Sequence, residues 1–268
     1  MVYSYYPGCT LRNKAKDLDF YARQCAEKLG FSLEEIENWQ CCGGVYPLGS
    51  DEIASKLSSV RVLNEAKEKK QDLVAVCSAC YHVLKRVNDD MKNVSDINFR
   101  ANNYMSFDEP YSGETTVLHY LEVLRDRVGF DNLRKAVTKP LTGKKIAAYY
   151  GCLLLRPGKI MQFDDPENPT IMEDFIRALG AEPVIYPLRN ECCGGYISLE
   201  EPASARRMTD EIIDSAHGFG ADMIITACPL CMYNLRKSLS EKNIEVTYFT
   251  EILAKALGII EEDEDENN

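Results

Sequence analysis

The sequence predicts an α/β protein of two homologous halves, each a small parallel sheet flanked by helices, related by a pseudo-twofold axis. Three observations indicate this fold. Short β-rich runs alternate with helical segments along the chain, which is the pattern of a parallel sheet. Ten of the eleven cysteines fall into one series that occurs twice. An apolar content of 45% over 268 residues is enough to bury a sizeable core.

The duplication is visible in the cysteine spacing and in the residues around it. The first series is C-x31-C-C-x34-C-x2-C, and the second is C-x39-C-C-x34-C-x2-C. Flanking segments also match: "YYPGC" corresponds to "YYGC", "LVAVCSACYHVLKR" to "MIITACPLCMYNLRK", and "HYLEVL" to "YFTEIL". We therefore expect an N-terminal half over 1–140 with an insertion at about 88–113, a C-terminal half over 141–260, and an acidic tail over 261–268.

Each half shows the same order of elements. A strand ends shortly before a lone cysteine, a helix follows and ends at a glycine, and an extended run leads to the Cys-Cys pair. A second helix, a strand that ends at the CxxC motif, a fourth strand and a last helix complete the half. In the first half the expected segments are Val2–Tyr6, 14–29, Ile36–Trp39, 51–69, Leu73–Val76 and Thr115–His119. In the second half they are Ile146–Tyr150, 169–179, Val184–Tyr186, 201–217, Met223–Thr226 and Glu245–Tyr248.

The cysteines of each half are expected at one edge of its sheet. Strands of a parallel sheet all point the same way, and each cysteine site follows the carboxyl end of a strand. Thiols that are far apart in the sequence can therefore converge. The first cysteine set is Cys9, Cys41, Cys42, Cys77 and Cys80, and the second cysteine set is Cys152, Cys192, Cys193, Cys228 and Cys231.

Five thiols are more than a simple metal site needs. A zinc ion takes four ligands, and a cubane iron–sulfur cluster takes four thiolates. Adjacent side chains of an extended segment point to opposite sides, so Cys41 and Cys42 are suited to binding two different irons of an opened cluster. The paired glycines that follow let the backbone come close to such a cluster. Zinc in the N-terminal half stays an alternative, because four of the five thiols would satisfy that ion.

The two complete cysteine series resemble the signature of the CCG-domain family. Apart from the acidic tail, the whole chain is similar to the B subunit of the heterodisulfide reductases of methanogens. The resemblance implies that each half binds a non-cubane 4Fe–4S cluster through its five cysteines, with the disulfide substrate between the two clusters. It implies a catalytic oxidoreductase subunit that reduces the mixed disulfide CoM-S-S-CoB to coenzyme M and coenzyme B, the last step of methanogenesis.

The same resemblance implies partners that supply electrons. The chain has no ferredoxin-like C-x2-C-x2-C-x3-C-P segment and no G-x-G-x-x-G or Walker motif. We therefore expect electrons to come through the small ferredoxin-like C subunit and the flavin-containing A subunit of the reductase, with a hydrogenase or formate dehydrogenase in a larger complex. The net charge of −11 disfavours nucleic acid binding. The absence of a long apolar run and of a secretory signal predicts a cytoplasmic protein with no membrane span.

The implied substrate carries a sulfonate, carboxylates and a phosphate, so cationic groups are expected near it. Candidates follow the lone cysteine of each half, and they are Arg12, Lys14, Lys16, Arg156 and Lys159. His82 and His119 are candidate proton donors to the departing thiolates, because imidazole titrates near neutrality. For each of these residues the alternative is an ordinary solvent-facing or structural side chain.

One cysteine and two other functions complete the predictions. Cys25 shares a helix face with Tyr21 and Leu29, which indicates a buried small hydrophobe. Related respiratory subunits for lactate, glycolate and glycerol phosphate oxidation also carry CCG domains, although several begin with the ferredoxin-like segment that this chain lacks. A non-enzymatic electron-transfer or zinc-scaffold subunit is the other alternative. Iron and zinc counts per chain would separate these functions.

Overall fold

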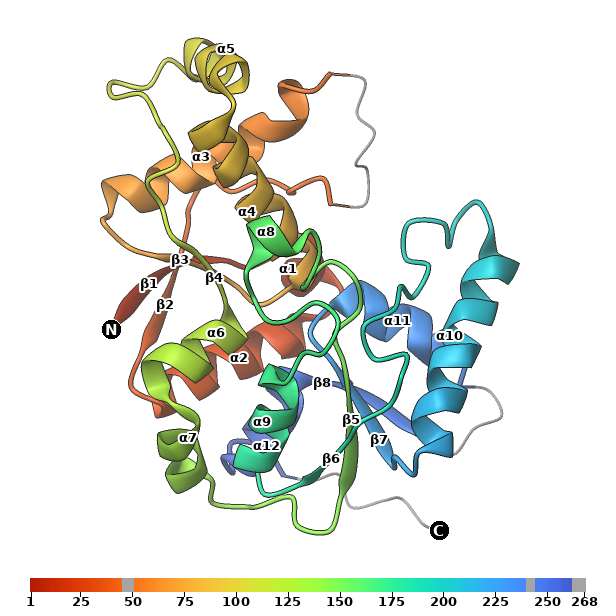
Figure 1. Cartoon of the computed structure of the whole chain (residues 1–268). Helices are drawn as coiled ribbons and strands as arrows, with labels where there is room; N and C mark the ends of the chain where they lie inside the picture. Colours follow the sequence, from red (N-terminus) through yellow and green to blue (C-terminus); the bar gives the residue numbers. More distant parts are fainter. Residues whose placement is uncertain (45–50, 240–243, 262–268) are drawn as a thin grey trace.

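Two four-stranded parallel sheets form the framework of the molecule (Figure 1). The computed structural model describes residues 1–44, 51–239 and 244–261, so the predicted acidic tail lies outside them from residue 262 onward. The first sheet has the order β2-β1-β3-β4, with β1 (Val2–Tyr6), β2 (Ser32–Glu35), β3 (Leu73–Ala75) and β4 (Val117–His119). The second has the order β6-β5-β7-β8, with β5 (Lys145–Tyr149), β6 (Glu182–Val184), β7 (Met223–Thr226) and β8 (Glu245–Tyr248). The identical strand order confirms the predicted α/β fold of two homologous halves.

Several helices also correspond between the halves, such as α3 with α10 and α4 with α11. The first half contains α1 (Gly8–Asn13), α2 (Lys16–Lys28), α3 (Ala54–Glu68), α4 (Ser78–Asn93), α5 (Ser95–Met105), α6 (Tyr120–Val123), the π-helical turn η1 (Leu124–Val128) and α7 (Phe130–Ala136). The second contains α8 (Gly158–Met161), α9 (Ile171–Ala178), α10 (Pro202–Gly218), α11 (Pro229–Lys237) and α12 (Phe249–Ala256). In both halves the helix that follows the third strand begins within the CxxC motif, at Ser78 and at Pro229.

The second strand of each half was predicted too far along the chain. Extended runs were expected at Ile36–Trp39 and Val184–Tyr186, whereas the strands are Ser32–Glu35 and Glu182–Val184. Gly30 ends the preceding helix with a φ of +84°, and the chain pairs with the central strand almost at once, beginning at Val2↔Ser32. The prediction was wrong because it placed the strand beside the cysteines, when pairing starts directly after the glycine.

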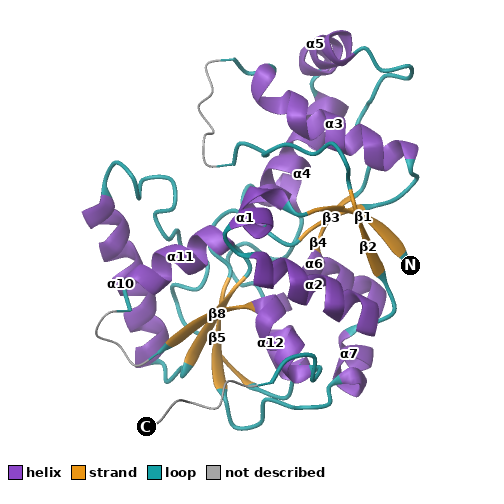
Figure 2. Cartoon of the chain, turned by 180° about the vertical axis from the view of Figure 1, so that it is seen from behind, coloured by secondary structure: helices purple, strands orange, loops and turns teal. Residues whose placement is uncertain are grey.

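The two halves share one hydrophobic core because they exchange their last helices. Helix α12 of the second half packs on α2 of the first half (Figure 2), and α7 of the first half packs on α9 of the second. Thr250 in α12 donates a hydrogen bond to the Leu18 carbonyl at 3.2 Å. One cluster of buried side chains runs through both halves, from Tyr3 to Leu257. The reciprocal packing fixes the halves relative to each other.

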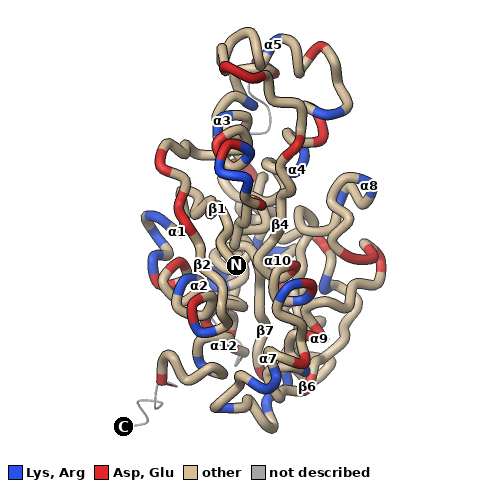
Figure 3. The backbone as a smooth tube through the Cα atoms, turned by 90° about the vertical axis from the view of Figure 1, so that its left-hand side faces the viewer, with Lys and Arg blue, Asp and Glu red and all other residues tan. Residues whose placement is uncertain are grey.

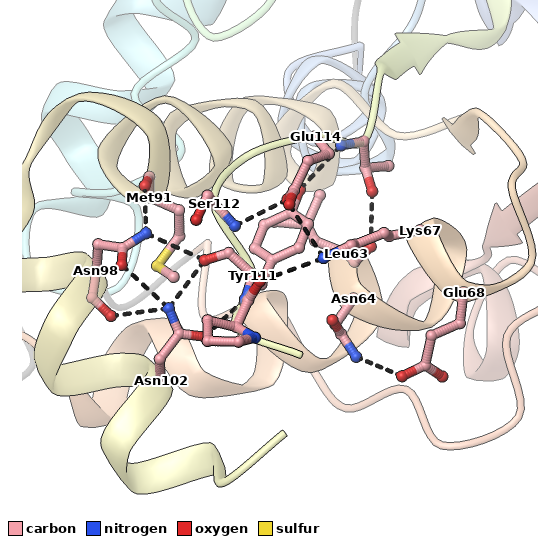
Figure 4. Close-up of polar contacts among 12 residues, drawn as sticks. Leu63, Asn64, Lys67, Glu68, Met91, Asn98, Asn102, Tyr111, Ser112 and Glu114 are labelled. Atoms are coloured by element: carbon pink, nitrogen blue, oxygen red, sulfur yellow. Dashed lines mark hydrogen bonds and ion pairs between the residues drawn. The ribbon is translucent and has the colours of Figure 1, made fainter. Parts of the chain in front are cut away.

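The predicted insertion forms the end of α4, all of α5 and the loop that leads to β4, and no helix occupies the corresponding place in the described residues between α11 and β8. Polar side chains hold it in place (Figure 4). The Asn98 amide donates to the carbonyls of Met91 and Tyr111 at 2.7 and 3.0 Å. The Asn102 side chain accepts from the Tyr111 N–H at 2.8 Å and donates to its carbonyl at 2.9 Å. Tyr111 itself is fully buried, so the loop is anchored at its centre.

Charged side chains of both signs line the outer helices. Figure 3 shows basic and acidic residues interspersed along α2 and α10. Arg23 on α2 bonds Asp19 at 2.9 Å and Glu35 at 2.6 Å, so opposite charges neutralise each other on this surface. Among the described residues, no helix combines the length and the apolar character that crossing a membrane would require.

Candidate metal centres

The second cysteine set surrounds one small cavity. All five of its members line a space of about 20 Å³, to which Ser78 of the first half also contributes. The Sγ atoms of Cys193 and Cys231 lie 3.4 Å apart, and the Cys192 thiol accepts a hydrogen bond from the Gly194 N–H at 3.3 Å. We call this space the thiol cavity. The structure thus brings together thiols that the sequence separates by up to 79 positions.

The first cysteine set converges in the same way. The Sγ atoms of Cys9 and Cys41 are 3.6 Å apart, as are those of Cys42 and Cys80. Cys9 and Cys41 are exposed, whereas Cys42 and Cys80 are buried. Cys41 thus lies beside Cys9, and Cys42 lies beside Cys80, so each member of the adjacent pair has its own partner from another segment.

The two cysteine sets meet at the interface of the halves. Hydrogen bonds from Cys231 of the same set and from Cys77 of the other set lower the pKa of Cys228. Beside them, Ser78 donates to the Ala227 carbonyl through its N–H at 3.0 Å and through its hydroxyl at 2.6 Å. The CxxC motifs of the two sets therefore lie side by side at this interface.

A glycine makes room for a thiol at the same place in each half. Gly8 and Gly151 have φ values of +74° and +64°, which side-chain-bearing residues rarely adopt. A Cβ atom on Gly8 would lie 2.7 Å from the Cys80 Sγ, and one on Gly151 would lie 3.3 Å from the Cys231 Sγ. In each half, the glycine before the lone cysteine thus leaves room for the Sγ atom of the last cysteine of the set.

A tyrosine fixes the loop that carries each Cys-Cys pair. Tyr6 ends β1 and donates to the Gln40 carbonyl at 2.6 Å, directly before Cys41. Tyr149 ends β5 and donates to the Glu191 carbonyl at 2.7 Å, directly before Cys192. Both side chains are buried, as expected for core packing, but their hydroxyl groups also tie the central strand to the cysteine loop.

Thiolates, which are the form that binds metals, are favoured at one member of each pair. Hydrogen bonds from Cys41 and Cys80 lower the pKa of Cys42 to about 3. A hydrogen bond from Cys152, with help from the Gly194 and Gly195 N–H groups, lowers the pKa of Cys192 to about 6. This donor set suits soft metals such as iron in a cluster or zinc.

The arrangement differs from that of a site for one ion. In the part of the chain that the structure describes, no three or more His, Cys, Asp or Glu side chains are grouped as ligands of a single metal. A multi-iron cluster instead takes one thiolate at each iron, so its ligands are spread around several metals. The converging thiols of each half suit an iron–sulfur cluster in chemistry.

The five predicted substrate cations lie outside the cavities beside the cysteines. Arg156 is bonded to the Asn190 carbonyl at 2.8 Å and to Glu167 at 3.2 Å, so it fastens one loop to another. Arg12 is exposed and 3.9 Å from Glu35. Lys14, Lys16 and Lys159 are exposed. Their role in substrate binding stays a prediction.

The two predicted proton donors have different environments. His82 lines a second cavity, which also contains Cys42, and its Nδ1 is 3.0 Å from the Leu153 carbonyl. His119 is fully buried. Its Nδ1 accepts from the Leu121 N–H at 3.2 Å, so Nε2 carries the proton and donates to the Val76 carbonyl at 3.0 Å. His119 therefore caps a helix and braces the interface, and His82 is the histidine that faces a cavity.

Three residues at these cavities were not singled out from the sequence. Tyr196 follows the second Cys-Cys-Gly-Gly run and lines both cavities. Burial, together with nearby thiolates, raises the pKa of Tyr196 to about 12. Arg86 and Lys56 line the cavity beside Cys42. The position of Arg86 one helical turn beyond His82 was the available signal, because residues four apart share a helix face. Cys25 is fully buried, as predicted.

The fold and the cysteine sets define a duplicated cysteine-rich α/β protein. The chain belongs to the CCG cysteine-rich domain family, whose model matches residues 3–85 and 146–236. These two matches fall in the two predicted halves, and they confirm the resemblance drawn from the cysteine spacing.

Relatives align along nearly the whole chain. The 8-methylmenaquinol:fumarate reductase membrane anchor subunit of Wolinella succinogenes is 33% identical over 96% of this chain and 92% of its own length. The B subunit of the ferredoxin/F420H2-dependent CoB-CoM heterodisulfide reductase of Methanosarcina acetivorans is 26% identical over 95% and 89%. A protein of Archaeoglobus profundus that is described as like the B subunit of heterodisulfide reductase is 25% identical over 96% and 90%.

A solved structure supports the fold alone. A hypothetical protein from Helicobacter pylori superimposes with a TM-score of 0.74 at 13% identity, covering 98% of this chain and 49% of that one.

Proposed function

We propose that this chain is the iron–sulfur catalytic subunit of a heterodisulfide reductase, in the role of the B subunit, and that it reduces CoM-S-S-CoB to coenzyme M and coenzyme B. The hydrogen bonds from Ser78 to the Ala227 carbonyl carry the proposal, since they join the CxxC motifs of the two cysteine sets at one interface. We further propose one non-cubane 4Fe–4S cluster per cysteine set. The matches to heterodisulfide reductase B subunits over nearly the whole chain support this role.

The residues around the two sets would organise the reaction. When bound, two clusters supply two electrons, which is what the cleavage of one disulfide requires. The thiol cavity opens beside the second set, and the cavity with His82 opens beside Cys42 of the first. Tyr196 lines both, so a disulfide held against this side chain reaches both sets. His82 is the proposed proton donor to a departing thiolate.

The wider assembly is proposed from the same likeness. The sequence has no cysteine series beyond the two sets, and we propose that another protein brings electrons to them. We propose the ferredoxin-like C subunit and the flavin-containing A subunit of such a reductase for this task, with a hydrogenase or formate dehydrogenase upstream and a cytoplasmic location. The duplicated units are proposed to be residues 1–140 and 141–260.

Metal analysis and an activity assay test the proposal. Protein purified without oxygen should contain about eight irons and a matching amount of sulfide per chain. Two zinc ions and no iron would instead identify a zinc scaffold. With iron present, reduced viologen dye should be oxidised when CoM-S-S-CoB is added. Iron-loaded protein that fails to react with this disulfide would refute the catalytic role. Electron transfer between partners would then be the remaining function.

One comparison favours a second function. The relative at 33% identity belongs to an 8-methylmenaquinol:fumarate reductase, which suggests electron transfer within a quinol-dependent complex. In that role the clusters would pass electrons between partners, and disulfide cleavage would be absent. Oxidation of the reduced protein by fumarate, only in the presence of a fumarate reductase subunit, would favour this function over the first.

A further inference from the structure

The cavity beside Cys42 has a different chemical character from the thiol cavity. It measures about 140 Å³ and lies between α3 and α4, where Ser55, Lys56, His82, Arg86 and Asp90 contribute polar groups. The thiol cavity is lined mainly by cysteine, leucine and tyrosine. We call the larger space the Arg86 cavity. The two cavities share Tyr196, so they lie on either side of one side chain.

Most charges of the Arg86 cavity are already matched. Lys56 and Asp90 form an ion pair at 2.9 Å, which leaves little net charge on either. His82 is held at the Leu153 carbonyl, 3.0 Å from its Nδ1. Arg86 is the exception, because it is exposed and no described carboxylate lies within ion-pair distance of its guanidinium. The cavity therefore holds one unneutralised positive charge.

The position of Arg86 relates this charge to the first cysteine set. Cys80 and Arg86 are on the same helix, α4, and lie about 9 Å apart along its axis. Arg86 and Cys42 line the same cavity, so the guanidinium and the first cysteine set border one space. A molecule with a sulfur atom and an anionic group on a short carbon chain can reach both the first cysteine set and Arg86.

In the described residues of the second half, the cation at the equivalent position does not line a cavity with the cysteines. The repeat pairs Arg86 with Lys237, and Lys237 lies 4.4 Å from the centre of the Tyr233 ring in a cation–π contact. The groove that Lys237 lines, between α10 and α11, contains none of the cysteines. The two halves therefore differ in the charge that lies beside their cysteine sets.

We propose that the Arg86 cavity is a binding subsite for the anionic group of a thiol or disulfide, with Arg86 as the residue that selects the charge. The ligand class is a short-chain thiol that ends in a sulfonate, carboxylate or phosphate. This subsite deepens the proposed function and rests on it, because it assigns one end of the disulfide to the first cysteine set. A guanidinium offers such an anion two parallel N–H donors.

Two probes test the subsite; they share a mercaptoethyl chain and end in an anionic sulfonate or in a neutral hydroxyl group. Iron-loaded protein is titrated without oxygen with 2-mercaptoethanesulfonate and with uncharged 2-mercaptoethanol, and affinities are measured by calorimetry. The wild type should bind the sulfonate about tenfold more tightly. Arg86→Gln should abolish that preference, and Arg86→Lys should keep part of it. Lys92→Gln is the matched control, because Lys92 is an exposed cation on the same helix outside the cavity.

The outcomes separate the subsite from the function on which it rests. Equal binding of both probes by the iron-loaded wild type, or an Arg86→Gln variant that still prefers the sulfonate, would overturn the subsite alone. Protein without iron would overturn the proposed function and the subsite with it. A sulfonate preference that weakens as salt is added, and that disappears only in Arg86→Gln, would establish the subsite.

Discussion

His119 and Tyr248 donate hydrogen bonds to the same acceptor, the main-chain oxygen of Val76, at 3.0 and 2.8 Å. They end the fourth strand of each half, β4 and β8, and occupy equivalent positions in the repeat. Tyr248 also donates to the Ala227 carbonyl at 2.9 Å. Val76 and Ala227 directly precede Cys77 and Cys228. The fourth strands thus hold the two CxxC motifs together where the cysteine sets touch.

Removal of the Tyr248 hydroxyl should weaken this junction. In Tyr248→Phe, the Ala227 carbonyl keeps Ser78 as a donor and the Val76 carbonyl keeps His119, but each loses one bond in a buried site. We expect a loss of about 1–2 kcal/mol in the free energy of unfolding, measured by denaturant titration. Tyr104→Phe is the control, since Tyr104 is 71% exposed. Equal stabilities of the two variants would show that the bridge contributes nothing.

The buried His119 should make stability sensitive to acid. Burial lowers the pKa of His119 to about 3, whereas an unfolded histidine titrates near 6.5. Between these values the unfolded chain binds a proton that the folded protein does not, so this contribution to stability is present above about pH 6.5 and is lost as the pH falls toward 3. His119→Gln keeps an N–H donor for Val76 and removes the titration. Its free energy of unfolding should therefore decline less steeply than that of the wild type from pH 7.5 to 5.

The exposed His217 provides the comparison for this pH effect. His217→Gln should retain the wild-type slope over the same range. Identical slopes for the two glutamine variants would mean that His119 does not set the acid sensitivity.

The sequence predicted well the features that depend on one residue type. It predicted less well the features that depend on packing between segments far apart in the chain. The apolar run Met223–Thr226 forms β7 with the predicted ends, and thiols of each cysteine series converge. The exchange of α12 and α7 between the halves was not foreseen, because an apolar helix face does not reveal which half will cover it. Arg86 was passed over for a related reason. A single arginine on a helix is usually solvated, and only its place beside Cys42 distinguishes it.

Each tyrosine at the end of a central strand should affect how firmly its own half retains iron. In Tyr6→Phe the Gln40 carbonyl loses its bond to β1, and in Tyr149→Phe the Glu191 carbonyl loses its bond to β5. Each change frees one Cys-Cys loop, so each variant should lose iron faster than the wild type when a chelator is added. Tyr5→Phe is a matched control, since Tyr5 is also buried but bonds Asp19 at 2.6 Å. Iron release from Tyr5→Phe as fast as from Tyr6→Phe would mean that general loosening is responsible.

The chain contains one tryptophan, and its position makes it a reporter for the first cysteine set. Trp39 lies two residues before Cys41, packs edge-on against Tyr6 with ring centres 5.6 Å apart, and donates to Glu35 at 3.0 Å. A bound iron–sulfur cluster absorbs the light that the indole ring emits, so fluorescence should be low in the iron-loaded protein and rise as iron leaves the first half. During chelation Tyr6→Phe should therefore brighten early. Tyr149→Phe should lose iron without an early rise, because its weakened loop is in the other half. If fluorescence rises equally with iron release in both variants, the tryptophan reports on the whole molecule. The prediction that each tyrosine affects iron only in its own half would then be wrong.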